Sequence, residues 1–183
     1  ALAFHLDGPD SPVALRQSPR TSGHSLMTAA PDESQPLAER RKAEATLRAL
    51  LTRAAPEHAR LVTAIRKALR TRLPAAHELI YDYGKAVVIG FSPTHRGIEA
   101  VFAIRASAKG VTLYLNRGKD IPDPEKLLKG SAKLVRMLPV ESAAELKRPA
   151  AAALLDAAIA LNPLPFATRD KGSVTLKQSS RKR

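Results

Sequence analysis

The hydrophobic period of this chain changes once along its length, and that change limits the folds open to it. In the first half, apolar residues recur at helical spacing, so that Leu47, Leu50 and Leu51 share one face of a predicted helix over residues 38–55. Further on, residues 111–116 alternate strictly between apolar and polar, as in a strand with one buried face. A switch from a period of 3.6 to a period of 2 predicts an α+β domain.

A second helix is predicted over residues 57–72. Pro56 suits the first turn of a helix, and the Leu73-Pro74 pair ends one. Its apolar residues fall on one face, and its basic residues fall opposite: Arg60, Arg66, Lys67 and Arg70. The two helices therefore form a short amphipathic pair.

Five later segments have the composition and alternation of strands: residues 86–91, 99–105, 111–116, 133–140 and 173–177. Gly97 and Gly110 mark connections that are typical of antiparallel hairpins. A short helix is predicted from Asp123, as N-cap, to a stop at Gly130, and an Ala-rich helix over residues 149–161. We therefore expect an α+β fold in which an antiparallel sheet of about five strands is packed by an N-terminal helix pair and a C-terminal Ala-rich helix.

The chain divides into three parts by composition. Residues 1–36 contain five prolines and few large apolar side chains, which predicts a disordered leader. Residues 37–178 form the expected domain, and residues 179–183 form a basic tail. Met27 is an alternative start of the protein.

Cysteine is absent, which excludes disulfides, thiolate metal sites and a thiol nucleophile. No apolar run approaches the roughly 18 residues that a membrane span needs. A cytoplasmic location without membrane attachment is the expectation, and the oligomeric state stays open.

Positive charge is unevenly distributed over the chain. The net charge is +13, and residues 38–72 carry ten basic but only three acidic side chains, while residues 168–183 carry six and one. Such clustering favours a polyanion partner such as nucleic acid, bound through its phosphates without sequence readout. The alternative is that a chain rich in Arg and Ala is basic through composition alone.

Two groups of basic residues are candidates for binding an anion. The first is the outward face Arg60, Arg66, Lys67 and Arg70 together with the tail residues Lys177, Arg181, Lys182 and Arg183. The second is the Gly130 turn, whose backbone N–H groups and flanking charges could hold a phosphate or carboxylate: Lys129, Lys133 and Arg136. The alternative for this second group is a helix C-cap followed by an edge strand.

Catalytic and cofactor motifs are not found in the sequence. It contains neither Gly-x-Ser-x-Gly nor His-Glu-x-x-His, and the Gly130 turn lacks P-loop spacing. We therefore expect a binding module that is not an enzyme and holds no cofactor.

Several local motifs resemble the YdhG-like family, known as domain of unknown function 1801, over residues 44–178. They are Glu78, Tyr83-Gly84, the alternating run with Arg117-Gly118 after it, and the most specific piece, residues 123–136. The resemblance implies an antiparallel sheet with helices on it and no established reaction.

Some members of that family are described as frataxin-like iron chaperones, which supplies an alternative function. A chaperone of that kind uses an acidic ridge on its first helix, whereas residues 38–55 carry mostly basic side chains beside Glu39 and Glu44. His77, Glu78 and Asp82 are close in sequence, but no regular spacing puts all three on one face. We therefore expect no metal site.

Overall fold

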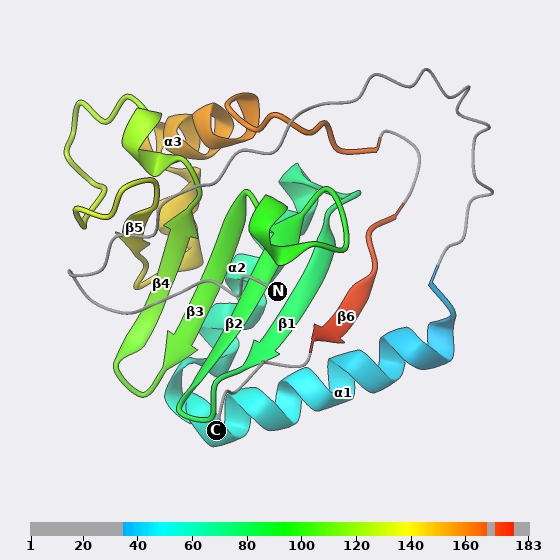
Figure 1. Ribbon diagram of the computed structural model, residues 1–183. Coiled ribbons are helices and arrows are strands. Elements are labelled where there is room, and N and C mark those ends of the chain that lie inside the picture. The colour runs from blue at the N-terminus through cyan, green and yellow to red at the C-terminus, as the bar shows by residue number, and fades with distance from the viewer. Residues whose placement is uncertain (1–34, 168–170, 178–183) are drawn as a thin grey trace, which may run out of the picture.

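Three α-helices and a six-stranded sheet make up the part of the chain that the structure, a computed structural model, describes, which is residues 35–167 and 171–177 (Figure 1). The helices are α1 (Leu37–Ala54), α2 (Ala59–Arg72) and α3 (Pro149–Ala160). The strands are β1 (His77–Asp82), β2 (Ala86–Ser92), β3 (Phe102–Ser107), β4 (Gly110–Leu115), β5 (Arg136–Pro139) and β6 (Val174–Lys177). Short 3-10 turns lie between them: η1 (Pro56–His58), η2 (Gly97–Glu99), η3 (Gly118–Asp120) and η4 (Ala143–Lys147). The predicted α+β class is confirmed.

The strand order in the sheet is β5-β4-β3-β2-β1-β6. From β1 to β5, each strand pairs antiparallel with the next one along the chain, which confirms the antiparallel arrangement predicted for β2 to β5. Gly84 (φ 74°) and Gly110 (φ 128°) occupy two of the tight connections, in a backbone region that glycine adopts without steric cost. The last strand differs from the expectation, because β6 pairs parallel with β1 at the edge of the sheet.

Strand β1 was absent from the sequence prediction, so the sheet has six strands and not about five. Glu78, Ile80 and Asp82 alternate onto the side of the sheet that faces the helices, where a strand normally presents apolar residues. Both carboxylates are stabilised there by ion pairs with helix arginines: Glu78 pairs with Arg66, and Asp82 pairs with Arg53. Periodicity in one segment cannot reveal a partner that comes from another segment.

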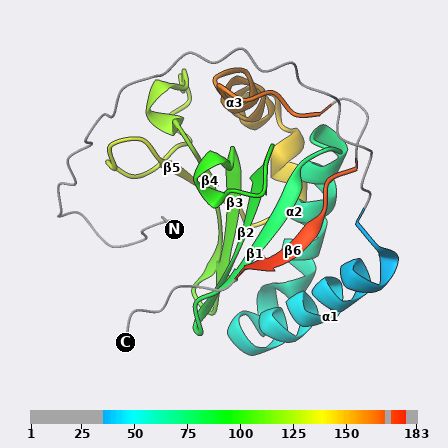
Figure 2. The same ribbon diagram turned by 45° about the vertical axis from the view of Figure 1, so that its right-hand side comes forward.

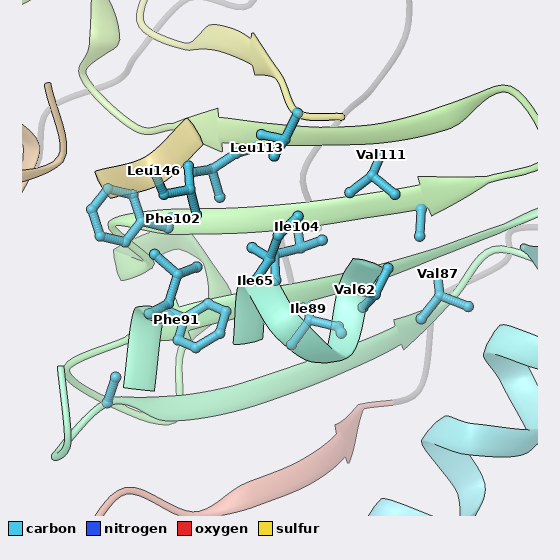
Figure 3. Packing of buried hydrophobic residues seen from close by; sticks show 14 of the residues in the cluster. Val62, Ile65, Val87, Ile89, Phe91, Phe102, Ile104, Val111, Leu113 and Leu146 are labelled. Carbon is cyan, nitrogen blue, oxygen red and sulfur yellow. The ribbon is translucent and has the colours of Figure 1, made fainter. Parts of the chain in front are cut away.

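Helices α1 and α2 cover the same face of the sheet (Figure 2). The core lies between these helices and the sheet. There, Val62 and Ile65 of α2 pack against Phe91, Phe102 and Ile104 of the central strands (Figure 3). All of these side chains are buried, which removes their apolar surface from water. The amphipathic pair predicted from the sequence is thus the layer that closes the core.

A smaller apolar cluster lies on the other face of the sheet. It contains Leu79, Tyr81, Val88 and Ala103, with Tyr83 and Tyr114 packed against it. Burial raises the pKa of Tyr81, with a smaller contribution from the neighbouring Tyr83, and burial raises the pKa of Tyr83 too.

The helix predicted from Asp123 to Gly130 does not form. The Asp123 carboxylate accepts hydrogen bonds from the backbone N–H groups of Leu127 and Leu128, as a helix N-cap would. However, Lys126, directly before Leu127, has a φ of 54°. A left-handed residue at that point ends the turn before a helix can propagate. The following strand is also shorter than the predicted 133–140, because only Arg136–Pro139 pair with β4.

The predicted disordered leader, apart from residues 35 and 36, and the basic tail at 179–183 lie outside the described residues.

Candidate nucleic-acid interface

Two arginines and two glutamates join α1, α2 and β1 beneath the helix surface. The Arg66 guanidinium donates to both carboxylate oxygens of Glu44 at 3.0 Å and to Glu78 Oε2 at 2.7 Å. Arg70 donates to the same pair, to Glu44 Oε1 at 2.7 Å and to Glu78 Oε1. Every charge in this cluster therefore has an opposite charge within hydrogen-bonding distance.

The cluster shifts the pKa values of Glu44 and Arg70. Burial opposes ionisation of Glu44, but hydrogen bonds and charge from Arg66 and Arg70 outweigh it and lower the pKa of Glu44 to about 2. Burial likewise disfavours the charged form of Arg70, and the two carboxylates reverse that effect and raise its pKa. Both shifts favour the charged forms of Glu44 and Arg70.

Arg66 was predicted to face outward, and this is wrong. Its side chain is only 8% exposed, because residue 66 lies between Val62 and Leu69 on the helix and turns toward α1 and β1. Arg70 was assigned to the same outward face, but its side chain is only 38% exposed and forms ion pairs with Glu44 and Glu78. Both arginines are therefore engaged within the fold.

Four other exposed basic side chains lie on the helix pair, and we call them the basic helix face: Arg41 and Arg48 on α1, and Arg60 and Lys67 on α2. Each pair is seven residues apart, which places its two members on one side of their helix. Within the described residues, none of the four takes part in an ion pair. Their charges are thus available to a partner.

Three of these four residues lie close in sequence to members of the buried cluster. Glu44 lies between Arg41 and Arg48 in the sequence of α1, and Arg66 lies beside Lys67 on α2. Glu44 and Arg66 hold the two helices together. Arg41 and Arg48 thus lie about one turn on either side of the α1 residue that contacts α2, and Lys67 directly follows the α2 residue that contacts α1. The spacing of seven between Arg41 and Arg48 is the sequence signal that could have identified them as site residues. The sequence analysis used the basic charge of residues 38–55 only as an argument against an acidic metal-binding ridge.

The remaining predicted site residues do not join this surface. Lys177 pairs in register with Tyr81, whose side chain lies in the cluster on the face opposite the helices, so Lys177 points to that opposite face. The tail residues of the same prediction lie outside the described part of the chain: Arg181, Lys182 and Arg183.

The second candidate group, around Gly130, is organised by backbone pairing. Lys129 exchanges two backbone hydrogen bonds with Met137, and the Arg136 guanidinium donates to the carbonyl oxygens of Ala132 and Val135. Arg136 thus closes its own loop, while Lys129 and Lys133 are exposed beside it. The helix C-cap considered for this turn is wrong, because no helix precedes it.

In residues 35–167 and 171–177, no three His, Asp or Glu side chains gather closely enough to hold a metal ion. Glu78 and Asp82, two of the acidic residues considered for iron, instead accept hydrogen bonds from arginines.

Comparison with protein-family models, with curated proteins and with solved structures found no match to this chain. The resemblance to the YdhG-like family therefore stays a prediction. The helices that the structure describes are all too short or too polar to cross a membrane.

Proposed function

We propose that this domain is a non-enzymatic binding module whose basic helix face contacts the phosphates of a nucleic acid, without reading base sequence. The observation that carries the proposal is the set of four exposed side chains, Arg41, Arg48, Arg60 and Lys67, that have no ion-pair partner among the described residues. An unpaired row of this kind attracts a polyanion and releases its counterions on binding.

The acidic residues of the helix pair support the same proposal. Glu44 is one of only three carboxylates in residues 38–72, and Arg66 and Arg70 neutralise it. Glu39 lies in the first turn of α1 and Glu57 in η1, so neither lies between the helices along their length. The middle of the basic helix face thus keeps a positive potential.

Phosphate contact without sequence readout fits the chemistry of these side chains. Long, flexible Arg and Lys side chains on two helices reach backbone phosphates, whereas base readout needs a rigid element in a groove. The proposal includes action in the cytoplasm and membership of the YdhG-like family, for which the cysteine-free composition and the motifs at 123–136 are the support.

Salt dependence tests the proposal. Binding of the full chain to a fluorescent duplex DNA should weaken with salt, with a slope of log affinity against log salt near −3.6 if four phosphates are contacted, since each contributes about −0.9. Duplexes of unrelated sequence should give the same slope and affinity. Affinity that is insensitive to salt, or that depends on sequence, would contradict the proposal.

A further inference from the structure

All three tyrosines of the chain lie on the face of the sheet that is opposite to α1 and α2, and we call this surface the tyrosine face. Tyr81 belongs to β1 and Tyr83 directly follows that strand, with their ring centroids 6.4 Å apart, whereas Tyr114 belongs to β4. None of the described helices contributes a residue to their cluster, and Figure 2 shows α1 and α2 on the other side of the sheet. Three aromatic rings are thus gathered on a face that the described helices leave uncovered.

The tyrosine rings differ in how far they are covered. Tyr81 is buried, because the backbone of η2 packs on its ring: a Cβ at Gly97 would lie 2.1 Å from the Tyr81 hydroxyl. Tyr83 and Tyr114 are only partly buried. Tyr114 pairs in register with Ala103, whose small side chain leaves room for a ring over the sheet. Tyr83 and Tyr114 are therefore the rings that a planar partner can reach.

Two basic residues lie in register with the tyrosines. Lys177 of β6 is paired with Tyr81, which is paired with Val88 of β2, and Val88 in turn is paired with Arg105 of β3. Directly paired residues of neighbouring strands present their side chains on the same face. Lys177 and Arg105 therefore belong to the tyrosine face, one at the edge of the sheet and one in its middle.

A third basic residue lies at the opposite edge of the sheet. Lys129 forms a bridge with Met137 of β5, and Met137 is paired in register with Tyr114. Within the described part of the chain, none of Arg105, Lys129 and Lys177 takes part in an ion pair. Positive charge is thus spread from one edge of the tyrosine face to the other.

The described acidic residues do not oppose this charge. Glu78 and Asp82 of β1 point to the helices, and the side chains that the six described strands present on the tyrosine face include no carboxylate. Glu99, in the η2 turn beside Tyr81, is paired with Arg96 at 2.8 Å. The charges of the described strands on this face therefore favour an anionic partner.

Aromatic rings beside unpaired cations are the combination that binds single-stranded nucleic acid. Unpaired bases stack on aromatic side chains, while Arg and Lys contact the phosphates. In a duplex the faces of the bases are already stacked on one another, so they cannot stack on Tyr83 or Tyr114. These two tyrosines are three strands apart, about 14 Å at the usual strand spacing, which a few nucleotides of an extended strand cover.

We propose that the tyrosine face binds single-stranded nucleic acid, with bases stacked on Tyr83 and Tyr114 and phosphates contacted by Arg105, Lys129 and Lys177. This surface is distinct from the basic helix face proposed above, which lies on the helices. Each surface can therefore be tested without the other, and either proposal can fail alone.

Intrinsic tyrosine fluorescence reports on this face alone, because its three tyrosines are the only ones in the chain and tryptophan is absent. Titration of the full chain at low salt with an oligothymidylate of about ten nucleotides should quench this fluorescence saturably, since bases stack on the rings. Arg48→Glu/Lys67→Glu, in the basic helix face, should keep the quenching. Absence of quenching by the oligothymidylate, or equal quenching by a duplex or by polyglutamate, would overturn the proposal.

Substitutions on the tyrosine face provide a second test, read by the fluorescence anisotropy of a labelled oligothymidylate. Tyr114→Ala should bind about tenfold more weakly than the wild type, a loss typical of one stacked base. Tyr114→Phe is the matched control, because it keeps the ring and should bind as the wild type does. If Tyr114→Ala is folded by circular dichroism and binds as tightly as Tyr114→Phe, the proposal is wrong.

Lys177→Gln tests the same face without removing a packed ring, since Lys177 ends the edge strand β6. Its slope of log affinity against log salt should be less negative by about 0.7, the contribution of one phosphate contact on a single strand. Lys147→Gln, an exposed lysine of η4, is the control and should keep the wild-type slope. Equal slopes of Lys177→Gln and the control would contradict a phosphate contact at this edge.

Discussion

Arg66 Nε donates a 2.7 Å hydrogen bond to Glu78 Oε2, and this pair connects α2 to β1 where both side chains are almost fully buried. The bond places a charged arginine in the position of a core residue and allows a glutamate on the inner face of the sheet. It also fixes which side of α2 is left for solvent. Because Arg66 turns inward, Arg60 and Lys67 are the α2 residues that remain for the basic helix face.

Removing Arg66 should destabilise the protein strongly. In Arg66→Ala the Glu78 carboxylate, 2% exposed, loses a buried partner, and breaking a buried ion pair from one side typically costs about 3–5 kcal/mol. Urea unfolding measures the free energy. The exposed Arg60→Ala on the same helix is the control and should change stability by less than about 0.5 kcal/mol. Equal effects of the two variants would show that the buried pair has no special role.

Replacing both partners tests whether the cost comes from the buried Glu78 carboxylate, which keeps only the partly exposed Arg70 as a partner when Arg66 is removed. The Arg66→Met/Glu78→Gln double variant leaves no buried full charge at either position, so it should be more stable than Arg66→Met alone. The same urea experiment provides the comparison. A double variant that is less stable than either single variant would mean that the effects simply add.

Low pH should reduce the free energy of unfolding, and protonation of Glu44 should account for part of the loss. Its folded-state pKa, about 2, lies below the ordinary value of 4.5, so its stabilising contribution is present above pH 4.5 and is lost as pH falls toward 2. In Glu44→Gln this contribution is missing at every pH. The free energy of unfolding should therefore fall less steeply between pH 4.5 and 2 in the variant than in the wild type, which denaturant titration at several pH values measures.

Much of the fold could be predicted from local pattern, because helix and strand periods are properties of single segments. The helix pair, the Ala-rich helix and the hairpin strands β2 to β4 were predicted in this way. Strand β1 was not, since the carboxylates of Glu78 and Asp82 interrupt its apolar pattern and their partners lie on helices. The parallel pairing of β6 was also missed, because nothing within residues 173–177 specifies strand direction.

The site was only partly predictable for the same reason. Arg60 and Lys67 were placed outward correctly from the helical period alone. Arg66 has the same charge and seemed to belong with them, but a position at the boundary of the apolar face can turn inward when an acidic partner is supplied from elsewhere. Glu44, 22 residues away in sequence, is one such partner, and no local pattern connects the two.

Docking of β6 should depend on Gly172. A Cβ at this position would lie 1.7 Å from the carbonyl oxygen of Ala76, so Gly172→Ala requires the backbone to move. A loss of about 1–3 kcal/mol is expected, as for other overpacked sites. Gly90→Ala is the control, since its Cβ would meet Ala100 at an ordinary 3.5 Å. Thermal unfolding should separate the two variants, and an unchanged midpoint in Gly172→Ala would contradict the described position of this segment.

The central claim is that the basic helix face, and not net charge alone, binds nucleic acid. Fluorescence anisotropy with a duplex DNA at low salt compares Arg48→Glu/Lys67→Glu with Lys109→Glu/Lys147→Glu, two pairs of exposed residues that change the net charge equally. The helix-face variant should bind at least about tenfold more weakly than the wild type, with a salt slope less negative by about 1.8 for two lost phosphate contacts, while the control variant stays close to the wild type. Equal losses in both variants, or no binding by the wild type at low salt, would contradict the account.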